Sequence, residues 1–237
     1  MQRIVTSTAC CGLQAPCEGC EAHDLAVCAA LSREQLATVA PLVRSRTLRP
    51  GAVLFHEGHG AEHVFTVTGG VLKLYKLFDG QRQVTGFATI SDFLRLACND
   101  VYVYSAEAVG DARVCRFDRR RFAAALERFP AMERALLERT SNELAAAQEQ
   151  MPLLGRKTAR ERLASFLVGL ARRPRGLSHG LVPLPMSRAD IADYLGLTVE
   201  TVSRTLTALR RERLIGMPNK HVVQILDPDA LDRLGNG

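Results

Sequence analysis

Apolar residues recur along the chain with different spacings, and each spacing predicts a different kind of structure. Over 32–43 they share one side of a short helix that Ser32 can cap. Between Thr47 and Phe117 short apolar runs alternate with glycine turns, which is typical of a small antiparallel sandwich or jelly roll. The predicted strands cover residues 52–55, 63–67, 71–78, 83–88 and 113–117, with turns at Glu57-Gly58, Gly69-Gly70 and Asp79-Gly80.

Helical periodicity returns near Arg120 and continues to about Arg173. Within it a stripe of residues recurs at alternating spacings of three and four, like the seam of a two-stranded coiled coil. The stripe consists of Leu137, Thr140, Leu144, Ala147 and Met151. It can pack this helix on the β domain of its own chain, or it can form the interface of a homodimer.

The last third of the chain predicts a helix-turn-helix. Ser187 opens a capping box at the start of the first helix. Gly196 ends that helix, because glycine tolerates the positive φ of a helix end. Thr198 can then cap a second helix over 199–213, and two apolar runs over 214–225 predict a hairpin that forms a wing.

Four polar residues share one face of the second predicted helix. Glu200, Ser203, Arg204 and Thr207 stand at positions i, i+3, i+4 and i+7. An arginine near the start of a recognition helix can bond bidentately to guanine, and a glutamate can accept a hydrogen bond from cytosine. A surface ion pair between Glu200 and Arg204 would have the same spacing. The helix-turn-helix context favours base reading by this face.

Positive charge is concentrated in the same third of the chain. The 237 residues carry a net charge of +6, and between Gly155 and Arg213 there are twelve Lys and Arg against five Asp and Glu. A basic domain on a nearly neutral body is typical of nucleic-acid binding. The sequence has no run of eighteen apolar residues and no signal peptide, so we expect the protein in the cytoplasm.

Cysteines gather near the N-terminus, where five of the seven lie within the first 28 residues. Cys17, Cys20 and Cys28 form a Cys-x2-Cys-x7-Cys pattern, and thiolates select zinc, copper(I) or an iron–sulfur cluster. A four-thiolate site needs one more ligand. The candidates are Cys10, Cys11, Cys98 and Cys115. The residues alone do not choose the metal, and a thiol-redox enzyme that uses Cys17 and Cys20 is a remote alternative.

The segment over 195–204, Leu-Gly-Leu-Thr-Val-Glu-Thr-Val-Ser-Arg, resembles the recognition segment of the FNR/FixK branch of the CRP/FNR superfamily of bacterial transcription regulators. In that branch, which includes FnrN-type regulators, the motif Glu-x-x-Ser-Arg reads inverted TTGAT-type half-sites. The resemblance therefore implies that Glu200, Ser203 and Arg204 read bases. It also implies a regulator and not an enzyme.

The resemblance covers nearly the whole chain, because residues 50–74 are similar to the sensory β-roll of the superfamily. It implies an α+β fold, with an N-terminal β-roll (a cyclic-nucleotide-binding-like jelly roll), a long dimerisation helix and a C-terminal winged helix-turn-helix. We expect a cysteine-rich segment over 1–31, the β-roll over 32–125, the dimerisation helix over 126–154 and the DNA-binding domain over 155–237.

The implied partners are palindromic double-stranded DNA, a second copy of the chain and RNA polymerase. In the superfamily a hairpin loop of the β-roll touches RNA polymerase. That loop corresponds here to Phe78, Asp79, Gly80 and Gln81.

Oxygen-sensing members of the branch bind a [4Fe–4S] cluster through three N-terminal cysteines and one cysteine of the β-roll. The resemblance implies Cys17, Cys20, Cys28 and Cys115 as the ligands, in a homodimeric activator of anaerobic gene expression that binds DNA in low oxygen. Two alternatives within the family are a FixK-like regulator that no cluster gates and structural zinc on the same cysteines.

The chain departs from the superfamily at two positions. Cyclic-nucleotide-binding members carry an arginine beside the serine that holds the phosphate, whereas Ser105 has no such neighbour, so no cyclic nucleotide is expected. Oxygen-labile relatives often carry an acidic residue in the dimer seam, where this chain has Ala147. Without that repulsion, we expect the clusterless protein to dimerise more readily than in those relatives.

Overall fold

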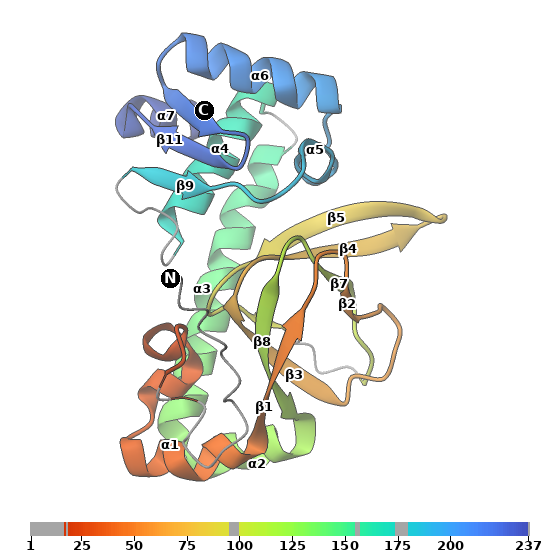
Figure 1. Ribbon diagram of the computed structural model, residues 1–237, viewed down its shortest axis with the longest axis vertical. Helices are drawn as coiled ribbons and strands as arrows, with labels where there is room; N and C mark the ends of the chain where they lie inside the picture. The colour runs from red at the N-terminus through yellow and green to blue at the C-terminus, as the bar shows by residue number, and fades with distance from the viewer. Residues whose placement is uncertain (1–16, 18, 95–99, 155–156, 174–179, 237) are drawn as a thin grey trace, which may run out of the picture.

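The structure, a computed structural model, describes residues 17, 19–94, 100–154, 157–173 and 180–236 of the chain. Its longest helix, α3 (Pro130–Leu154), runs from the end of the β domain towards the C-terminal domain (Figure 1). The other helices are α1 (Arg33–Val39), α2 (Arg119–Arg128), α4 (Ala159–Arg172), α5 (Arg188–Leu195), α6 (Val199–Arg211) and α7 (Pro228–Asn236).

The β domain is a roll of two four-stranded antiparallel sheets, which confirms the predicted jelly roll. One sheet has the strand order β1-β8-β3-β6 and the other has the order β2-β7-β4-β5. The strands are β1 (Val43–Leu48), β2 (Val53–Phe55), β3 (His63–Gly69), β4 (Leu72–Phe78), β5 (Gln81–Ala88), β6 (Phe93–Leu94), β7 (Ser105–Ala108) and β8 (Ala112–Asp118). Apolar side chains of both sheets form one core, in which the rings of Phe55 and Tyr102 stack with their centroids 4.0 Å apart.

The first predicted helix is shorter than its apolar pattern, and Val43 belongs to a strand. Ser32 caps α1 in a capping box with Gln35, as the sequence predicts for the cap. The helix ends at Val39, because Pro41 has no amide hydrogen to donate to the carbonyl of Ala37. Val43 then opens β1 and still contributes to the core that Leu36 and Val39 enter from α1.

The hairpin of β4 and β5 forms at the turn that the sequence predicts. Asp79 and Gly80 take φ values of 49° and 78°, the left-handed geometry that a tight two-residue hairpin turn requires. Another predicted turn ends at Gly70, where a Cβ would lie 2.3 Å from the carbonyl oxygen of Asp111. A side chain at Gly70 would therefore push the turn between β3 and β4 away from the start of β8.

The C-terminal domain is a winged helix-turn-helix, as predicted. Helices α5 and α6 are joined at Gly196, which has a φ of 63°. The wing is a three-stranded antiparallel sheet of the order β10-β11-β9. Its strands are β9 (Leu181–Pro183), β10 (Ile215–Asn219) and β11 (Val222–Ile225). Strand β9 and helix α7 are not among the predicted elements. Helix α7 packs on α4, with Gly235 close to the backbone of Ser165.

The two domains share one hydrophobic core. Tyr75 of β4 and Val84 and Phe87 of β5 are buried in the same cluster as the apolar side chains of the helix-turn-helix. The ring of Phe87 meets that of Tyr194 in α5 edge-on, with the centroids 5.4 Å apart. The β4–β5 hairpin thus lies against α5 (Figure 1).

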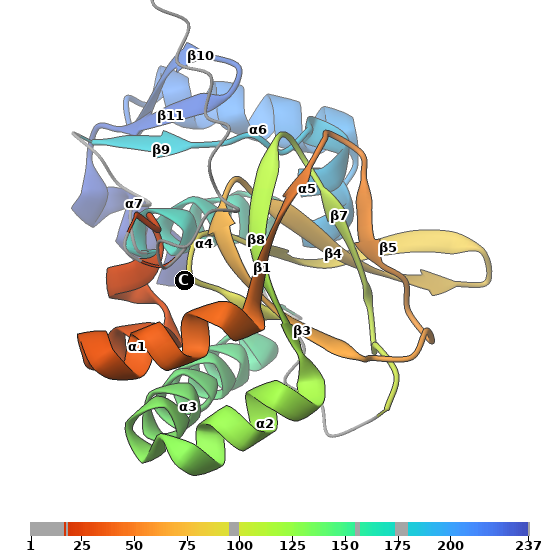
Figure 2. The ribbon, with the colours of Figure 1, turned by 60° about the horizontal axis from the view of Figure 1, so that its bottom comes forward.

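The N-terminal segment packs around the first turns of α3. Two short 3₁₀-helices, His23–Leu25 and Val27–Ala30, precede α1. The second of them contacts α3, and α1 lies beside α3 in both views (Figures 1 and 2). The fully buried Met132 of α3 belongs to the core that joins this segment to α2 and β8.

Candidate DNA-binding surface and cysteine centre

Helix α6 has one face in the core and one face in solvent. Thr198 caps it by accepting a hydrogen bond from the amide of Thr201 at 3.1 Å. Val202, Leu206 and Leu209 are buried against the rest of the C-terminal domain. This anchors the helix by its apolar side, so the opposite side is available for a ligand.

The four predicted reading residues all lie on the exposed side of α6. Glu200, Ser203, Arg204 and Thr207 are exposed, and the hydroxyl of Thr207 donates to the carbonyl of Ser203 at 2.9 Å. The pKa of Glu200 is lowered first by a hydrogen bond from its own backbone amide and then by the hydroxyl of Thr198. Within the described chain Glu200 and Arg204 form no salt bridge, and both side chains are exposed on this side of α6.

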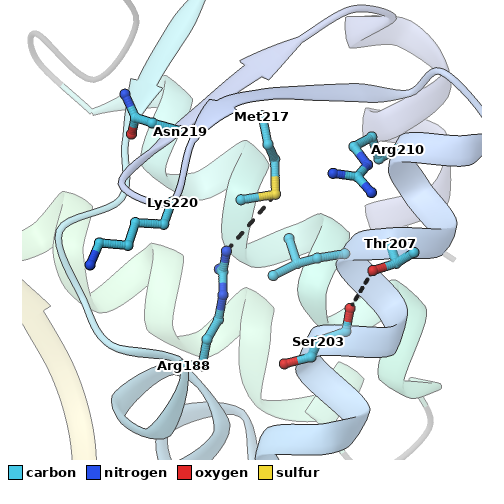
Figure 3. Close-up of a pocket in the computed structure, with 8 residues that line it drawn as sticks. Arg188, Ser203, Thr207, Arg210, Met217, Asn219 and Lys220 are labelled. Carbon is cyan, nitrogen blue, oxygen red and sulfur yellow. Dashed lines mark hydrogen bonds between the residues drawn. The ribbon is translucent and has the colours of Figure 1, made fainter.

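A hollow of about 400 Å³ separates α6 from the wing, and its lining is basic and polar (Figure 3). Ser203 and Thr207 line it from the helix. The other residues that line it are Arg188, Leu206, Arg210, Met217, Asn219 and Lys220. Such a concave positive surface beside a recognition helix can hold the phosphate backbone of DNA.

Arg188, Arg210, Asn219 and Lys220 were not among the predicted DNA-contacting residues. The sequence indicates a DNA contact only through the position of these residues. Arg188 directly follows the cap of α5, and Lys220 lies in the turn of the wing. Arg188 reaches into the hollow, where its Nη2 lies 3.9 Å from the sulfur of Met217 (Figure 3). Its Nη1 is buried without a hydrogen-bond partner, and burial lowers the pKa of the guanidinium.

Asp190 links the helix-turn-helix to the β-roll by charge. Its carboxylate accepts from the backbone amide of Ser187 at 3.3 Å, which completes the predicted capping box, and also from the hydroxyl of Ser187 at 2.6 Å. It also lies 3.4 Å from the ammonium of Lys73 in β4 and 3.2 Å from the guanidinium of Arg82 in β5. Lys73 is buried and also pairs with Glu107 at 2.8 Å. No local feature of the sequence indicates these contacts of Asp190 with the β-roll.

The pKa of Asp190 should make this contact sensitive to acid. Burial by itself raises the pKa, but the Ser187 hydroxyl and the charges of Lys73 and Arg82 outweigh it, so the pKa of Asp190 lies below the ordinary value of an aspartate. A carboxyl with a depressed folded-state pKa stabilises the fold at neutral pH and loses that contribution as the pH falls through the folded-state value. We expect Asp190→Asn to lower the free energy of unfolding at pH 7 by about 1.5–3 kcal/mol.

Thermal unfolding of wild type and Asp190→Asn between pH 7 and pH 3 measures this. The difference between the two proteins should shrink below about pH 4. Asp111→Asn, which changes an exposed carboxylate of the roll, serves as the control. A difference between wild type and Asp190→Asn that stays constant over this range would contradict the assignment.

The four cysteines that the resemblance implies as ligands come together. Cys17, Cys20 and Cys28 belong to the N-terminal segment, whereas Cys115 lies in β8, where it pairs in register with Ser45 and Thr66. The thiol of Cys115 is hydrogen-bonded to the sulfur of Cys20, and the charges of Cys17 and Cys28 act on it as well. All four are free thiols.

The pKa values of these four thiols differ. The hydrogen bond from Cys115 lowers the pKa of Cys20 to about 6, and it raises the pKa of Cys115. Burial raises the pKa of Cys17 and of Cys28 to about 11 each. Cys20 is therefore the thiol of the group that ionises most readily, whereas burial, and then the charge of the neighbouring cysteines, disfavours ionisation of Cys17 and Cys28.

The donor set fits an iron–sulfur cluster, which takes four thiolates. Structural zinc also takes four thiolates, and among the described residues no group of three His, Cys, Asp or Glu side chains is already arranged around one metal ion. The other candidate ligands, Cys10, Cys11 and Cys98, lie outside the described residues.

The predicted seam residues all lie in α3. Leu137 and Leu144 are 65 % and 58 % exposed, which is unusual for leucines on a helix that packs on its own chain. Thr140 is half-buried and donates to the carbonyl of Leu136 at 2.8 Å. The side chains of Ala147 and Met151 lie outside the described part of the structure. The exposed leucines favour the homodimer over packing within the chain.

The predicted polymerase loop is the tip of the β4–β5 hairpin. Phe78 is 58 % exposed at the tip, as is its neighbour Leu77. Ser105 stands where cyclic-nucleotide-binding members hold the phosphate, and its hydroxyl accepts a hydrogen bond from the amide of Glu57 at 2.9 Å. Ser105 is buried in β7.

Two families match separate parts of the chain. Residues 45–129 match the cyclic nucleotide-binding domain, and residues 161–234 match the Crp-like helix-turn-helix domain. These ranges contain the β-roll and the winged helix-turn-helix. In the part that the structure describes, no helix is long and apolar enough to cross a membrane.

The chain is similar to bacterial regulators over almost its full length. It is 42 % identical to the transcriptional activatory protein AadR of Rhodopseudomonas palustris, over 92 % of this chain and 95 % of the relative. It is 38 % identical to the transcriptional activator protein FnrL of Cereibacter sphaeroides, over 89 % and 88 %. Among solved structures, FixK2 from Bradyrhizobium japonicum is 36 % identical with a TM-score of 0.75, over 81 % of this chain and 96 % of that structure.

Proposed function

Since the chain belongs to the CRP/FNR family of transcription regulators, as a DNA-binding activator of its FNR/FixK branch, we propose that it responds to low oxygen through a [4Fe–4S] cluster. The observation that carries the proposal is the approach of Cys115 to the three cysteines of the N-terminal segment. When bound, the cluster would supply an iron–sulfur centre that reacts with oxygen.

The protein chain provides the cluster with a partly buried, electropositive site. Cys17 is buried, and the other three cysteines are half-buried. Charges of His23 and Arg113 act on Cys20, and the charge of Arg139 acts on Cys28. Positive charge stabilises the thiolates against the cost of their burial, and partial exposure leaves the site open to oxygen.

The DNA-reading role rests on α6. Glu200, Ser203 and Arg204 are proposed to contact bases of TTGAT-type half-sites, and the basic hollow beside them is proposed to hold the phosphate backbone. In a dimer the two recognition helices would sit about one turn of DNA apart, roughly 34 Å, which requires a palindromic site.

The dimer is proposed to form along α3. Leu137 and Leu144 offer apolar surface at the spacing of a coiled-coil seam, and Thr140 lies between them. Pairing with α3 of a second copy would cover this surface.

The hairpin tip over Phe78, Asp79, Gly80 and Gln81 is proposed to contact RNA polymerase, because an exposed aromatic on a tight turn offers a compact contact.

A cyclic nucleotide is not part of the proposal. No arginine neighbours Ser105 in the sequence to pair with a phosphate. Aromatic side chains of Phe55, Phe65 and Tyr102 also occupy the core of the roll. These features support a signal other than a cyclic nucleotide.

A second candidate is a regulator of the same branch that binds DNA whatever the state of the cysteines. Ala147 in the α3 seam favours it, because no acidic side chain there opposes dimerisation. In that case the cysteines would affect stability and not the affinity for DNA.

Anaerobic purification followed by a visible spectrum tests the proposal. We expect a broad visible band that bleaches in air, with about four iron atoms per chain, as a cubane on four thiolates requires. Gel shifts with a palindromic TTGAT duplex, in argon and after air, then separate the two candidates. Binding that is lost with the band supports oxygen sensing, and binding that persists supports the second candidate. A colourless protein that carries zinc would refute the cluster.

A further inference from the structure

Arg139 lies where α3, the β-roll and the cysteine segment meet. Its Nη1 donates to the carbonyl of Ser91 in the roll at 2.5 Å, and its Nη2 lies 3.3 Å from the hydroxyl of the same serine. Its Nη2 also donates to the carbonyl of Leu25 in the cysteine segment. One half-buried guanidinium therefore joins three parts of the molecule.

Ser91 is a fixed anchor for this contact. It is buried and has a φ of 75°, which is uncommon for a residue with a side chain. Its amide donates to the carbonyl of Val67 in β3 at 2.8 Å, and the next residue, Asp92, donates back to Thr89 at 3.0 Å. The turn between β5 and β6 is thus held by backbone bonds, and it presents its carbonyl to Arg139.

Leu25 has a very different setting, because it lies between two of the proposed cluster ligands. It ends the 3₁₀-helix His23–Leu25, which follows Cys20, and the next 3₁₀-helix contains Cys28. A change in the position of Cys20 or Cys28 must move the carbonyl of Leu25. The positive charge of Arg139 also acts on the Cys28 thiol, and it lowers a pKa that burial raises.

On α3, Arg139 neighbours the proposed dimer seam. Thr140 is the next residue, and the exposed Leu137 lies two residues before it. A force on Arg139 therefore acts on the first part of the seam. The planar guanidinium can bind two carbonyls at once in a fixed geometry, which a lysine ammonium does not reproduce.

We propose that Arg139 is a positioning residue that couples the cysteine segment to the dimerisation helix. When Cys20 and Cys28 are held, Arg139 clamps Leu25 and Ser91 together and fixes the start of the α3 seam against the roll. When they are released, the clamp opens on the Leu25 side and α3 loses this restraint. The inference rests on the proposed function for the event that holds or releases the cysteines.

The test compares wild type with Arg139→Met, which keeps the length of the side chain and removes the charge and the donors. Arg139→Lys keeps the charge alone. Arg134→Met serves as a matched control, because Arg134 is an exposed arginine of the same helix. Thermal unfolding checks that all four proteins are folded. The readouts are amide hydrogen exchange, the dimer dissociation constant from sedimentation, and the rate at which the visible band bleaches in air.

In Arg139→Met we expect amide exchange over 22–31 to be at least about tenfold faster, because charge-assisted hydrogen bonds to backbone carbonyls are lost. We expect weaker dimerisation and faster bleaching by a similar factor. In the Arg139→Lys variant, amide exchange should also be faster than in wild type. Its rate of bleaching should lie between the rates of wild type and Arg139→Met. Arg134→Met should match wild type in all three readouts.

If Arg139 couples the cysteine segment to α3, one further difference between wild type and Arg139→Met is expected. Exposure of wild type to air should speed exchange both over 22–31 and over 133–141 of α3, whereas in Arg139→Met the α3 segment should no longer respond. Unchanged exchange over 22–31 in Arg139→Met would overturn the clamp. Faster exchange there with unchanged dimerisation and an unchanged α3 response would overturn the coupling.

If the proposed function is wrong, the experiments give a different result. A wild-type protein that contains no iron would refute oxygen sensing through a cluster. Exchange and sedimentation of the metal-free wild type and Arg139→Met would still decide whether Arg139 ties the cysteine segment to α3.

Discussion

Anaerobically purified Cys115→Ser is expected to lack the visible band and to contain much less than the roughly four iron atoms per chain of a complete cluster. A serine hydroxyl is a poor ligand for iron that is held by thiolates. The substitution is nearly isosteric, and Cys115 is only half-buried in a strand that β1 and β3 pair on both sides. The β-roll should therefore remain folded, which circular dichroism and thermal unfolding can check.

Two matched variants make the experiment decisive. Cys20→Ser removes the sulfur to which Cys115 is hydrogen-bonded, and it should lose the band to the same extent. Cys98→Ser should keep the band, because Cys98 is not among the proposed ligands. The opposite result, with Cys98→Ser colourless and Cys115→Ser coloured, would assign the fourth ligand to Cys98 and refute the arrangement proposed here.

Arg204→Ala is expected to weaken binding to a palindromic TTGAT duplex by about 1–3 kcal/mol, which is roughly 5- to 150-fold. The guanidinium is exposed on the reading face of α6 and forms no salt bridge in the described chain that would hold it back. Arg204→Lys should be almost as weak, since an ammonium cannot form the bidentate bond to guanine. Fluorescence anisotropy with the palindrome and with a scrambled duplex measures both losses.

Arg210→Ala provides the contrast, because Arg210 lines the basic hollow beside the wing. A phosphate contact should weaken binding to the palindrome and to the scrambled duplex about equally and should reduce the salt dependence. If Arg204→Ala behaves in this uniform way instead, Arg204 contacts the backbone and its assignment to base reading is wrong.

The helix-turn-helix was predictable from the sequence because its signals are local. Ser187 and Thr198 cap their own helices, and Gly196 adopts the positive φ that its position requires. The periodic burial of Val202, Leu206 and Leu209 follows directly from their spacing. Each of these features depends on residues within one or two turns, so no tertiary information was needed.

Strand β7 shows where such local signals fail. Its sequence, Ser-Ala-Glu-Ala, contains no β-branched or aromatic residue, and nothing in it predicts a strand. It forms because it pairs with β2 on one side and with β4 on the other. Tertiary pairing likewise assigns Val43 to β1, although its spacing fits the helix before it.

The site could be predicted only in part for the same reason. The Cys-x2-Cys-x7-Cys pattern identifies three thiols, whereas Cys115 came from the resemblance and the structure places it beside Cys20. The partners of Arg139 and Asp190 lie far away in sequence, on the roll and on the N-terminal segment. No periodicity or local motif indicates such pairs.

The contact between α5 and the β4–β5 hairpin has a consequence for promoter architecture. The hairpin that presents Phe78 at its tip is held against the helix-turn-helix by the ion pairs of Asp190 with Lys73 and Arg82. Bound to an operator, the proposed polymerase-contacting tip would therefore point in one fixed direction around the DNA axis. An operator shifted by about five base pairs, half a helical turn, would turn this tip to the opposite side of the duplex. Promoters served by this protein should accordingly favour operator positions that differ by whole turns.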